Sequence, residues 1–272
     1  MSSISFTKIL KTIFEEKVLM RLVTYSEKNS TVKKPHLKEA KLGLLIDRGG
    51  DAFILPSSIR SMSELLNDPD LNMKLLNEEL KQKSSQAKLK LSEVHLHSPV
   101  PRPSSMRDGY AFRQHVATAR RNRGLEMIPE FDQFPVFYFT NHQAVFGPGE
   151  VDVQKRHLDK LDFELEVAIV IGKEGRNIAV ENADDYIFGY TIMNDWSARA
   201  LQMEEMKLNL GPAKGKDFAT TLGPFLITRD ELLESGRLKR TPKGEVFNAK
   251  MEAFLNDRQV SSGNVNQMDW TF

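Results

Sequence analysis

What the sequence lacks limits its chemistry first. It contains no cysteine and six histidines among 272 residues. Disulfides and thiolate metal sites are therefore excluded, and oxygen ligands are favoured for any metal because the histidines are scattered. The charges nearly cancel, at a formal net charge of +1, and no basic stripe interleaved with aromatic residues occurs. This composition argues against a nucleic-acid partner.

A long hydrophobic run is also missing. Charged residues interrupt the apolar stretch at 1–19 too often for a membrane span or a secretion signal, so we predict a cytoplasmic protein with no membrane partner. Apolar residues between Ile9 and Phe14 fit a short amphipathic helix in a possible N-terminal extension. Alternatively, Met20 is the natural start, because residues 20–25 resemble a first strand. The sequence leaves both interpretations open.

Residues 1–95 are predicted to form a small N-terminal α+β domain. Short apolar runs at 22–25, 43–46 and 52–54 predict strands, and helical spacing over 63–83 predicts a helix that is interrupted at Asp68-Pro69. Prolines between residues 99 and 103 then fix an extended connection. We therefore place a domain boundary near residue 95.

Residues 96–272 are predicted to form a second, β-rich domain. Strands are expected at 136–140, 161–171, 187–194, 224–228 and 246–255. Helices are expected at about 109–123 and 196–207. These helices are too few to cover both faces of a parallel sheet, so the pattern favours an α+β fold with a mixed sheet over a doubly wound fold.

The segment from Leu161 to Ile171 carries the most informative pattern. Every second residue is apolar, and the intervening positions begin with Asp162, Glu164 and Glu166. In a strand these carboxylates share one face at a spacing of about 6.5 Å, where like charges repel. A bound divalent cation would remove that repulsion, and a solvent-facing edge strand would tolerate it. This strand alone does not decide between the two.

Two further motifs begin where helices are expected. Asp195 is placed as an N-cap, with Arg199 and Gln202 on one stripe of the helix that follows. Asp108 is placed at the start of the helix that carries His115 two turns later. Taken alone, the first motif is a cap with a surface ion pair, and the histidine is a packed or solvated residue.

The last motif is a short loop at residues 211–218, in which glycines bracket a lysine. It is too short for a phosphate-binding loop of the Walker type, and Asp217 stands where Ser or Thr would reach Mg²⁺. Its lysine can deliver an ammonium group to an anionic substrate. Without other evidence the segment is interpreted as a solvated loop.

The four motifs occur in one order with characteristic gaps. They are Asp108-x-Tyr110-x4-His115, Leu161-Asp162-x-Glu164-x-Glu166, Asn194-Asp195-Trp196-Ser197-Ala198-Arg199-x2-Gln202 and Gly211-Pro212-x2-Gly215-Lys216-x-Phe218. With them, residues 98–272 resemble the fumarylacetoacetate hydrolase family, including its fumarylacetoacetase-like and acylpyruvase-like members. The resemblance implies a mixed β-sheet roll or barrel core with few peripheral helices.

The resemblance also implies a site. The implied metal ligands are Asp108, Glu164, Glu166 and Asp195. Four carboxylates suit a hard cation, with Mg²⁺ first and Ca²⁺ or Mn²⁺ as alternatives. Asp162 aligns with a position that is not a ligand, so we expect it to turn aside or to form local hydrogen bonds.

The remaining site residues are implied in the same way. His115 would be the general base that activates water, and Lys216 would stabilise a developing oxyanion. Arg199 would act in catalysis and, with Gln202, would bind substrate oxygens. Tyr110 and Tyr138 match substrate-facing tyrosines.

The implied function is a metal-dependent hydrolase that cleaves a carbon–carbon bond of an acylpyruvate or a fumarylacetoacetate-like diketo acid. A 1,3-dicarbonyl group can chelate the metal, which polarises one carbonyl and stabilises the enolate that leaves. A hydratase, isomerase or decarboxylase acting on a 2-keto acid would use the same metal site. A truncated, catalytically silent metal-binding chain is the alternative of another class. A homodimer is expected by resemblance only.

Two departures from the family pattern stand out. A decarboxylase branch of the family places a glutamate three residues after the histidine, where this chain has Thr118. This argues against a decarboxylase arrangement and leaves the partner of His115 open. The sequence also stops at Trp270-Thr271-Phe272 in mid-element, whereas the family continues with further strands, so we expect a domain truncated at its C-terminus.

Overall fold

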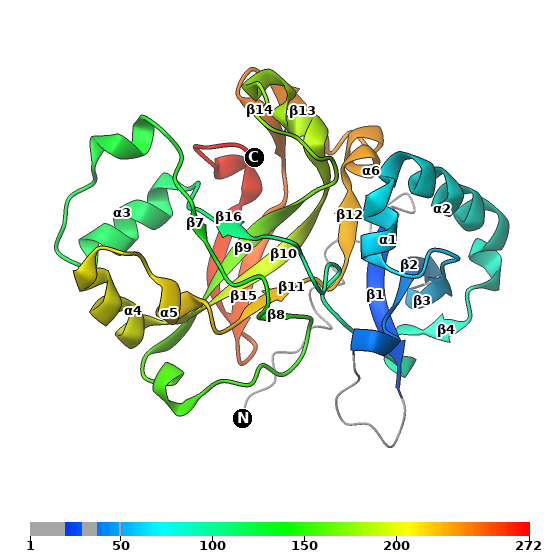
Figure 1. Ribbon diagram of the computed structural model, residues 1–272, viewed down its shortest axis with the longest axis horizontal. Coiled ribbons are helices and arrows are strands. Elements are labelled where there is room, and N and C mark those ends of the chain that lie inside the picture. Colours follow the sequence, from blue (N-terminus) through cyan, green and yellow to red (C-terminus); the bar gives the residue numbers. More distant parts are fainter. Residues whose placement is uncertain (1–19, 29–36, 49) are drawn as a thin grey trace.

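The computed structural model describes residues 20–28, 37–48 and 50–272 (Figure 1). The amphipathic helix expected near the N-terminus lies outside the described residues. The choice between Met1 and Met20 as the start therefore stays open.

Short strands dominate the chain. The strands are β1 Arg21–Glu27, β2 Lys41–Arg48, β3 Asp51–Pro56, β4 Leu89–Lys90, β5 Val94–Leu96, β6 Arg107–Asp108, β7 Tyr138–Phe139, β8 Val145–Phe146, β9 Leu161–Ile171, β10 Ile187–Ala198, β11 Thr220–Leu222, β12 Leu226–Thr228, β13 Leu238–Thr241, β14 Gly244–Phe247, β15 Lys250–Leu255 and β16 Arg258–Asn264. The helices are α1 Met62–Asn67, α2 Pro69–Lys83, α3 Arg113–Arg121, α4 Arg199–Glu205, α5 Ala213–Lys216 and α6 Arg229–Glu234.

A ten-stranded sheet forms the centre of the described structure, in the order β4-β3-β2-β1-β12-β10-β11-β8, with β5 paired to β1 and β9 paired to β10. The sheet is mixed, because β8 and β11 are parallel whereas the other pairs are antiparallel. Strand β10 is its longest member and is paired with β9 along its length. A large mixed sheet with few helices confirms the predicted fold class.

The N-terminal strands belong to the same sheet as the later ones. Arg21 and Leu22 of β1 lie opposite residues of β12. One hydrophobic core also joins Leu22 and Leu65 to Phe188 and Leu226, which come from the second half of the chain. The boundary near residue 95 therefore crosses a shared core, and it stays a prediction.

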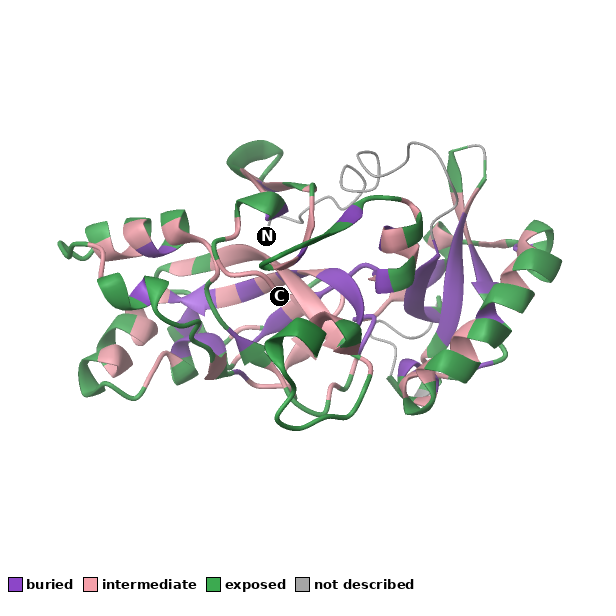
Figure 2. Cartoon of the chain, turned by 90° about the horizontal axis from the view of Figure 1, so that it is seen from above, coloured by how far each residue is buried: buried purple, intermediate pink, exposed green. Residues whose placement is uncertain are grey.

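Most helices gather at the two ends of the sheet, whereas α6 lies between them beside β12 and β13 (Figure 1). Helices α1 and α2 lie beside β1–β3 at one end, and α3, α4 and α5 lie together at the other (Figure 1). Buried residues follow the strands, whereas the outward faces of the helices are exposed (Figure 2). Within the described ranges, no helix is long and apolar enough to cross a membrane.

Two expected elements follow the sequence closely. The strand predicted at 161–171 is β9, with the same bounds. The helix predicted over 63–83 is divided into α1 and α2 at Asp68, whose side chain accepts a hydrogen bond from Leu71 N at 3.1 Å. Asp68 is therefore the N-cap of α2, and Pro69 is the first residue of that helix.

Other boundaries were predicted wrongly. Asp195 is not an N-cap, because β10 continues to Ala198, which is itself the N-cap of α4. Pairing with β9 through Ala198 holds this segment extended. Asp108 does not start a helix either, since it lies in β6 and α3 begins at Arg113. The single strand expected at 246–255 is divided between β14 and β15.

Candidate metal centre

The pairing of β9 with β10 brings acidic residues onto one face of the sheet. Asp195 lies directly opposite Glu164 in the antiparallel register. Opposite residues point to the same face, and residues two apart on a strand do so too. Glu164, Glu166 and Asp195 therefore share a face. Asp108 joins them from β6, which pairs with β7.

Three of the predicted ligands form a compact cluster. Asp108, Glu166 and Asp195 each offer one carboxylate oxygen, and these oxygens all lie within 4.8 Å of one another. Asp108 and Asp195 are buried, with exposed fractions of 8% and 1%. Oδ1 of Asp195 is buried and accepts no hydrogen bond from any described residue. A buried, unpartnered carboxylate oxygen within such a group fits a hard divalent cation.

The electrostatics of the cluster support this fit. Desolvation raises the pKa of Glu166 well above its ordinary value, and the neighbouring Asp108 and Asp195 raise it further. Desolvation likewise raises the pKa of Asp195 to about 7. Carboxylates so close together resist ionisation unless a positive charge joins them. The donor set is therefore one that a cation would stabilise.

Glu164 lies beside this cluster and already has cationic partners. Its Oε1 accepts a hydrogen bond from a terminal nitrogen of Arg199 at 2.7 Å, and its Oε2 accepts one from Lys216 Nζ at 2.8 Å. Burial alone would raise the pKa of Glu164, but the positive charges of Lys216 and Arg199 lower it to about 2. Its role as a metal ligand stays a prediction.

Lys216 is the buried cation of the site. The interpretation of its segment as a solvated loop was wrong, because Lys216 is 3% exposed and ends helix α5. Its Nζ donates to Oδ2 of Asp195 and, at 2.7 Å, to Oγ of Ser197. The ammonium group therefore touches both strand β10 and the neighbouring glutamate on β9.

Helix α5 is held against α4 by two local features. Glu205 at the end of α4 accepts hydrogen bonds from the backbone nitrogens of Lys214 and Gly215, each at 2.8 Å. A Cβ atom at Gly215 would lie 2.7 Å from Cβ of Gln202, so only glycine permits this approach. The close packing directs Lys216 into the site.

Arg199 links Asp162, the remaining acid of β9, to the site. Its Nε donates to Oδ2 of Asp162 at 2.8 Å, and a terminal nitrogen donates to Oε1 of Gln202 at 3.1 Å. Oδ1 of Asp162 accepts from the backbone nitrogen of Phe163 at 2.9 Å. This local bonding agrees with the expectation that Asp162 is turned aside from the metal ligands.

Tyr138 contacts the acidic cluster directly. Its hydroxyl lies 3.0 Å from Oδ2 of Asp108 and 3.3 Å from Oδ2 of Asp195, and it donates its single hydrogen to one of them at a time. His115 on α3 places Nε2 at 4.0 Å from Oε1 of Glu164. In this structure Glu164 is thus the acid that faces the predicted base.

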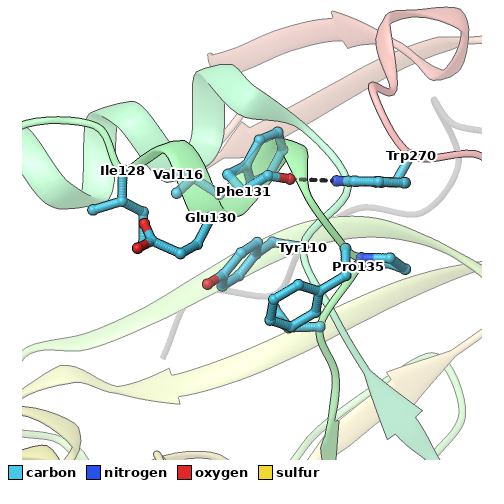
Figure 3. Close-up of a pocket in the computed structure, with 9 residues that line it drawn as sticks. Tyr110, Val116, Ile128, Glu130, Phe131, Pro135 and Trp270 are labelled. Carbon is cyan, nitrogen blue, oxygen red and sulfur yellow. Dashed lines mark hydrogen bonds between the residues drawn. The ribbon is translucent and has the colours of Figure 1, made fainter.

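Tyr110 lies farther out, in a small cavity of about 50 Å³ between α3 and the chain near the C-terminus. Its ring stacks on Phe131, with centroids 6.3 Å apart. Trp270 lines the same cavity and donates from Nε1 to the backbone oxygen of Phe131 at 2.8 Å (Figure 3). The structure therefore places Tyr110 among aromatic neighbours. Among the described residues, it forms no hydrogen bond with the acidic cluster.

Sequence reasoning missed two residues of the site. Ser197 lies inside the motif at 194–202, fully buried against Lys216, but its contact needed the position of α5. Glu205 carries no sequence signal, because an acid near a helix end is common. Ser197 accepts a hydrogen bond from Lys216, and Glu205 holds the short helix that carries this lysine.

The fold and the acidic cluster together define a β-rich protein with a group of carboxylates that could hold a metal ion. Residues 104–272 match the fumarylacetoacetate (FAA) hydrolase C-terminal domain. The chain belongs to the fumarylacetoacetate hydrolase family.

Named relatives in this family are enzymes. The chain is 38% identical over 156 residues to oxaloacetate tautomerase YisK of Bacillus subtilis (strain 168), which covers 55% of this chain and 48% of that protein. It is 27% identical over 254 residues to the human mitochondrial oxaloacetate tautomerase FAHD2A, covering 92% of this chain and 72% of that protein. The chain thus spans about half the length of the bacterial relative.

Solved structures show the same fold. The crystal structure of maleylpyruvate hydrolase from Sphingobium sp. SYK-6, in complex with manganese(II) ion and pyruvate, superposes with a TM-score of 0.57 at 20% identity. The match covers 92% of this chain and 78% of that one.

Proposed function

We propose that this protein binds a divalent cation and converts a 2-keto acid through its enolate. The observation that carries this proposal is the group formed by Asp108, Glu166 and Asp195, with Oδ1 of Asp195 buried and unpartnered among the described residues. Mg²⁺ is our first candidate, with Mn²⁺ and Ca²⁺ as alternatives, because oxygen-only sites select hard cations. The manganese ion bound to the maleylpyruvate hydrolase supports a cation of this kind.

A bound cation would supply positive charge that polarises the keto oxygen and stabilises the enolate. Side chains of this protein around the cation would act directly on the substrate. Arg199 and Gln202 would bind the substrate carboxylate, since a guanidinium group matches that geometry. Lys216 would stabilise negative charge on a substrate oxygen. His115 would move the proton at the carbon next to the keto group.

The first candidate reaction is an isomerisation between the keto and enol forms of oxaloacetate or a similar acid. The names of two relatives support it. It also needs no activated water. In this structure the acid nearest to His115 is Glu164, which is already bound to Lys216 and Arg199.

Hydrolysis of an acylpyruvate-like diketo acid is the second candidate reaction. The motif that contains His115, within a fumarylacetoacetate hydrolase domain, supports it. Here His115 would take a proton from water, and the enolate of the departing ketone or keto acid would be protonated afterwards.

One set of assays separates these reactions. With Mg²⁺ present, ketonisation of enol-oxaloacetate and cleavage of acetylpyruvate are each followed by ultraviolet absorbance. We expect accelerated ketonisation that EDTA abolishes. Acceleration of acetylpyruvate cleavage instead would select the hydrolase, and acceleration of neither would refute the proposed function.

His115→Asn tests the proposed base separately from the metal. We expect turnover to fall by a factor of about 10² or more, because general acid–base catalysis contributes on that scale. Mg²⁺ affinity, measured by titration calorimetry, should stay unchanged because His115 belongs to none of the described ligand groups. Retained turnover would exclude His115 as the base.

We also propose a homodimer in the cytoplasm, on the resemblance to the family alone. Sedimentation velocity over a range of concentrations tests the dimer, and a purely monomeric profile would contradict it.

A further inference from the structure

Asp162 of strand β9 binds the guanidinium group of Arg199 at Nε. A guanidinium group has five N–H donors in one plane. In this structure Nε–H donates to Asp162, one terminal nitrogen donates to Gln202, and the other donates to Glu164. These contacts use three of the five donors, so each terminal nitrogen keeps one N–H that can meet a substrate carboxylate.

Asp162 is itself a rigid anchor. It lies in β9 opposite Ser197, and its Oδ1 accepts a hydrogen bond from the backbone nitrogen of the next residue. Its contact at Nε acts together with those of Gln202 and Glu164 on the two terminal nitrogens, so the guanidinium plane is held on three sides. Of these three partners, Asp162 is the one that the site assigns neither to the metal nor to the substrate, so holding Arg199 is its contact with the site.

Stability gives this ion pair little reason to exist. The side chain of Asp162 is 48% exposed and that of Arg199 is 30% exposed. Ion pairs with this much solvent contact contribute little to the free energy of folding. The acid is also excluded from the group of Asp108, Glu166 and Asp195. A role in orienting Arg199 explains why a third carboxylate stands on a face that is already strongly acidic.

We propose that Asp162 is a positioning residue that aims the Arg199 guanidinium at the carboxylate of the substrate. The inference rests on the proposed function, because it assumes that the ligand is a 2-keto acid. It predicts a dependence on Asp162 that is specific to ligands with a carboxylate. A purely structural role would affect all ligands of the site alike.

The test compares two ligands that differ in this group. Pyruvate carries a keto group and a carboxylate, whereas acetylacetone is a chelating diketone without a carboxylate. Dissociation constants for both are measured by titration in the presence of Mg²⁺, for the unaltered protein, Asp162→Asn and Asp159→Asn. Asp159 is an exposed acid three residues earlier, so its variant removes the same charge without touching Arg199.

In Asp162→Asn we expect pyruvate to bind about tenfold more weakly, the scale of one charge-assisted hydrogen bond, while acetylacetone binds as before. Asp159→Asn should change neither constant. Equal pyruvate affinity in Asp162→Asn and the unaltered protein would overturn the positioning role, and so would an equal loss of both ligands. If the unaltered protein binds neither ligand, the proposed function itself fails.

Discussion

Two clusters of buried charge lie along strand β10, and they differ in how completely the charges are paired. In the first, Glu245 has a fully buried side chain whose Oε1 and Oε2 accept hydrogen bonds from Arg229 at 2.6 and 2.8 Å. Its Oε1 also accepts from Arg240 at 3.1 Å. In the second, Asp195 is equally buried, but Oδ1 has no partner among the residues that the structure describes.

The balance of charge explains this difference. Three acids, Glu245, Asp184 and Asp185, face two arginines, Arg229 and Arg240. Glu245 raises the pKa of Arg229 above its ordinary value, as expected for a stable ion pair. In the candidate metal centre, the four carboxylates of Asp108, Glu164, Glu166 and Asp195 face two cationic side chains among the described residues, Lys216 and Arg199, with His115 4.0 Å from Glu164. Burial by itself therefore does not distinguish the two clusters, whereas the larger excess of carboxylates over cations in the second cluster does.

The largest effect is expected from a change in the Glu245 cluster. Glu245→Gln should lower the free energy of unfolding by about 3 to 5 kcal/mol, because it removes the buried counter-charge of Arg229 and leaves that arginine only the exposed Asp185. Denaturant unfolding of the metal-free protein measures the loss. Glu234→Gln, an exposed acid on α6, is the control and should unfold like the unaltered protein. A loss below about 1 kcal/mol, the size of an exposed ion pair, would contradict a structural role for the cluster.

The corresponding change in the candidate metal centre should weaken metal binding and leave stability nearly unchanged. Asp195→Asn should weaken Mg²⁺ binding about 100-fold, because it removes a charged ligand. The metal-free protein should lose less than about 1 kcal/mol of stability, since a desolvated and repelled negative charge disappears with it. Calorimetric titration and denaturant unfolding measure the two quantities. Unchanged Mg²⁺ affinity would remove Asp195 from the ligand set.

Removing the charge of Lys216 should increase the difference in stability between the metal-free and the Mg²⁺-bound protein. In Lys216→Met, Mg²⁺ should bind about tenfold more tightly, because the ammonium group that repels the ion near Asp195 and Glu164 is gone. The metal-free protein should melt at a lower temperature, since those carboxylates lose their partner. Thermal unfolding with and without Mg²⁺ should show a wider gap than in the exposed control Lys214→Met. Weaker Mg²⁺ binding would instead make Lys216 a support for the ligands.

The smallest effect is expected from Tyr138→Phe. The variant removes a hydroxyl that lies within hydrogen-bond distance of Asp108 and Asp195. We expect the metal-free protein to lose about 1 kcal/mol of stability, the net value of one hydrogen bond. Saturating Mg²⁺ should recover most of this loss, because the ion would satisfy the same carboxylates. A loss that Mg²⁺ leaves unchanged would show that the tyrosine acts independently of the metal centre.

Local signals in the sequence predicted the acidic strand well. The alternation from Leu161 to Ile171 has the period of a strand, and it placed Glu164 and Glu166 on one face before any partner was known. The same kind of signal failed at Asp195, where an aspartate before a helix resembled a cap. There the long antiparallel pairing with β9 holds the backbone extended for three more residues.

The resemblance to the family implied a place for Lys216 in the site, but the local sequence pattern did not predict that this lysine is buried. Its segment is rich in glycine and lysine, which is typical of a solvated loop. The structure buries the lysine because Glu205 and Gly215 fasten α5 to α4. Such contacts depend on where two helices meet, and no local pattern carries that information.

The sequence by itself determined which chemistry was available: oxygen ligands in place of thiolates, an acidic face on β9, and the order of motifs that places the chain in its family. The tertiary structure decided how the acids divide their tasks. Asp108 arrives from a distant strand to join Glu166 and Asp195, Glu164 is bound by two cations, and Asp162 holds Arg199. Alternation along a strand is a local property, whereas the partners of each carboxylate follow from strand register and helix packing between segments far apart in the chain.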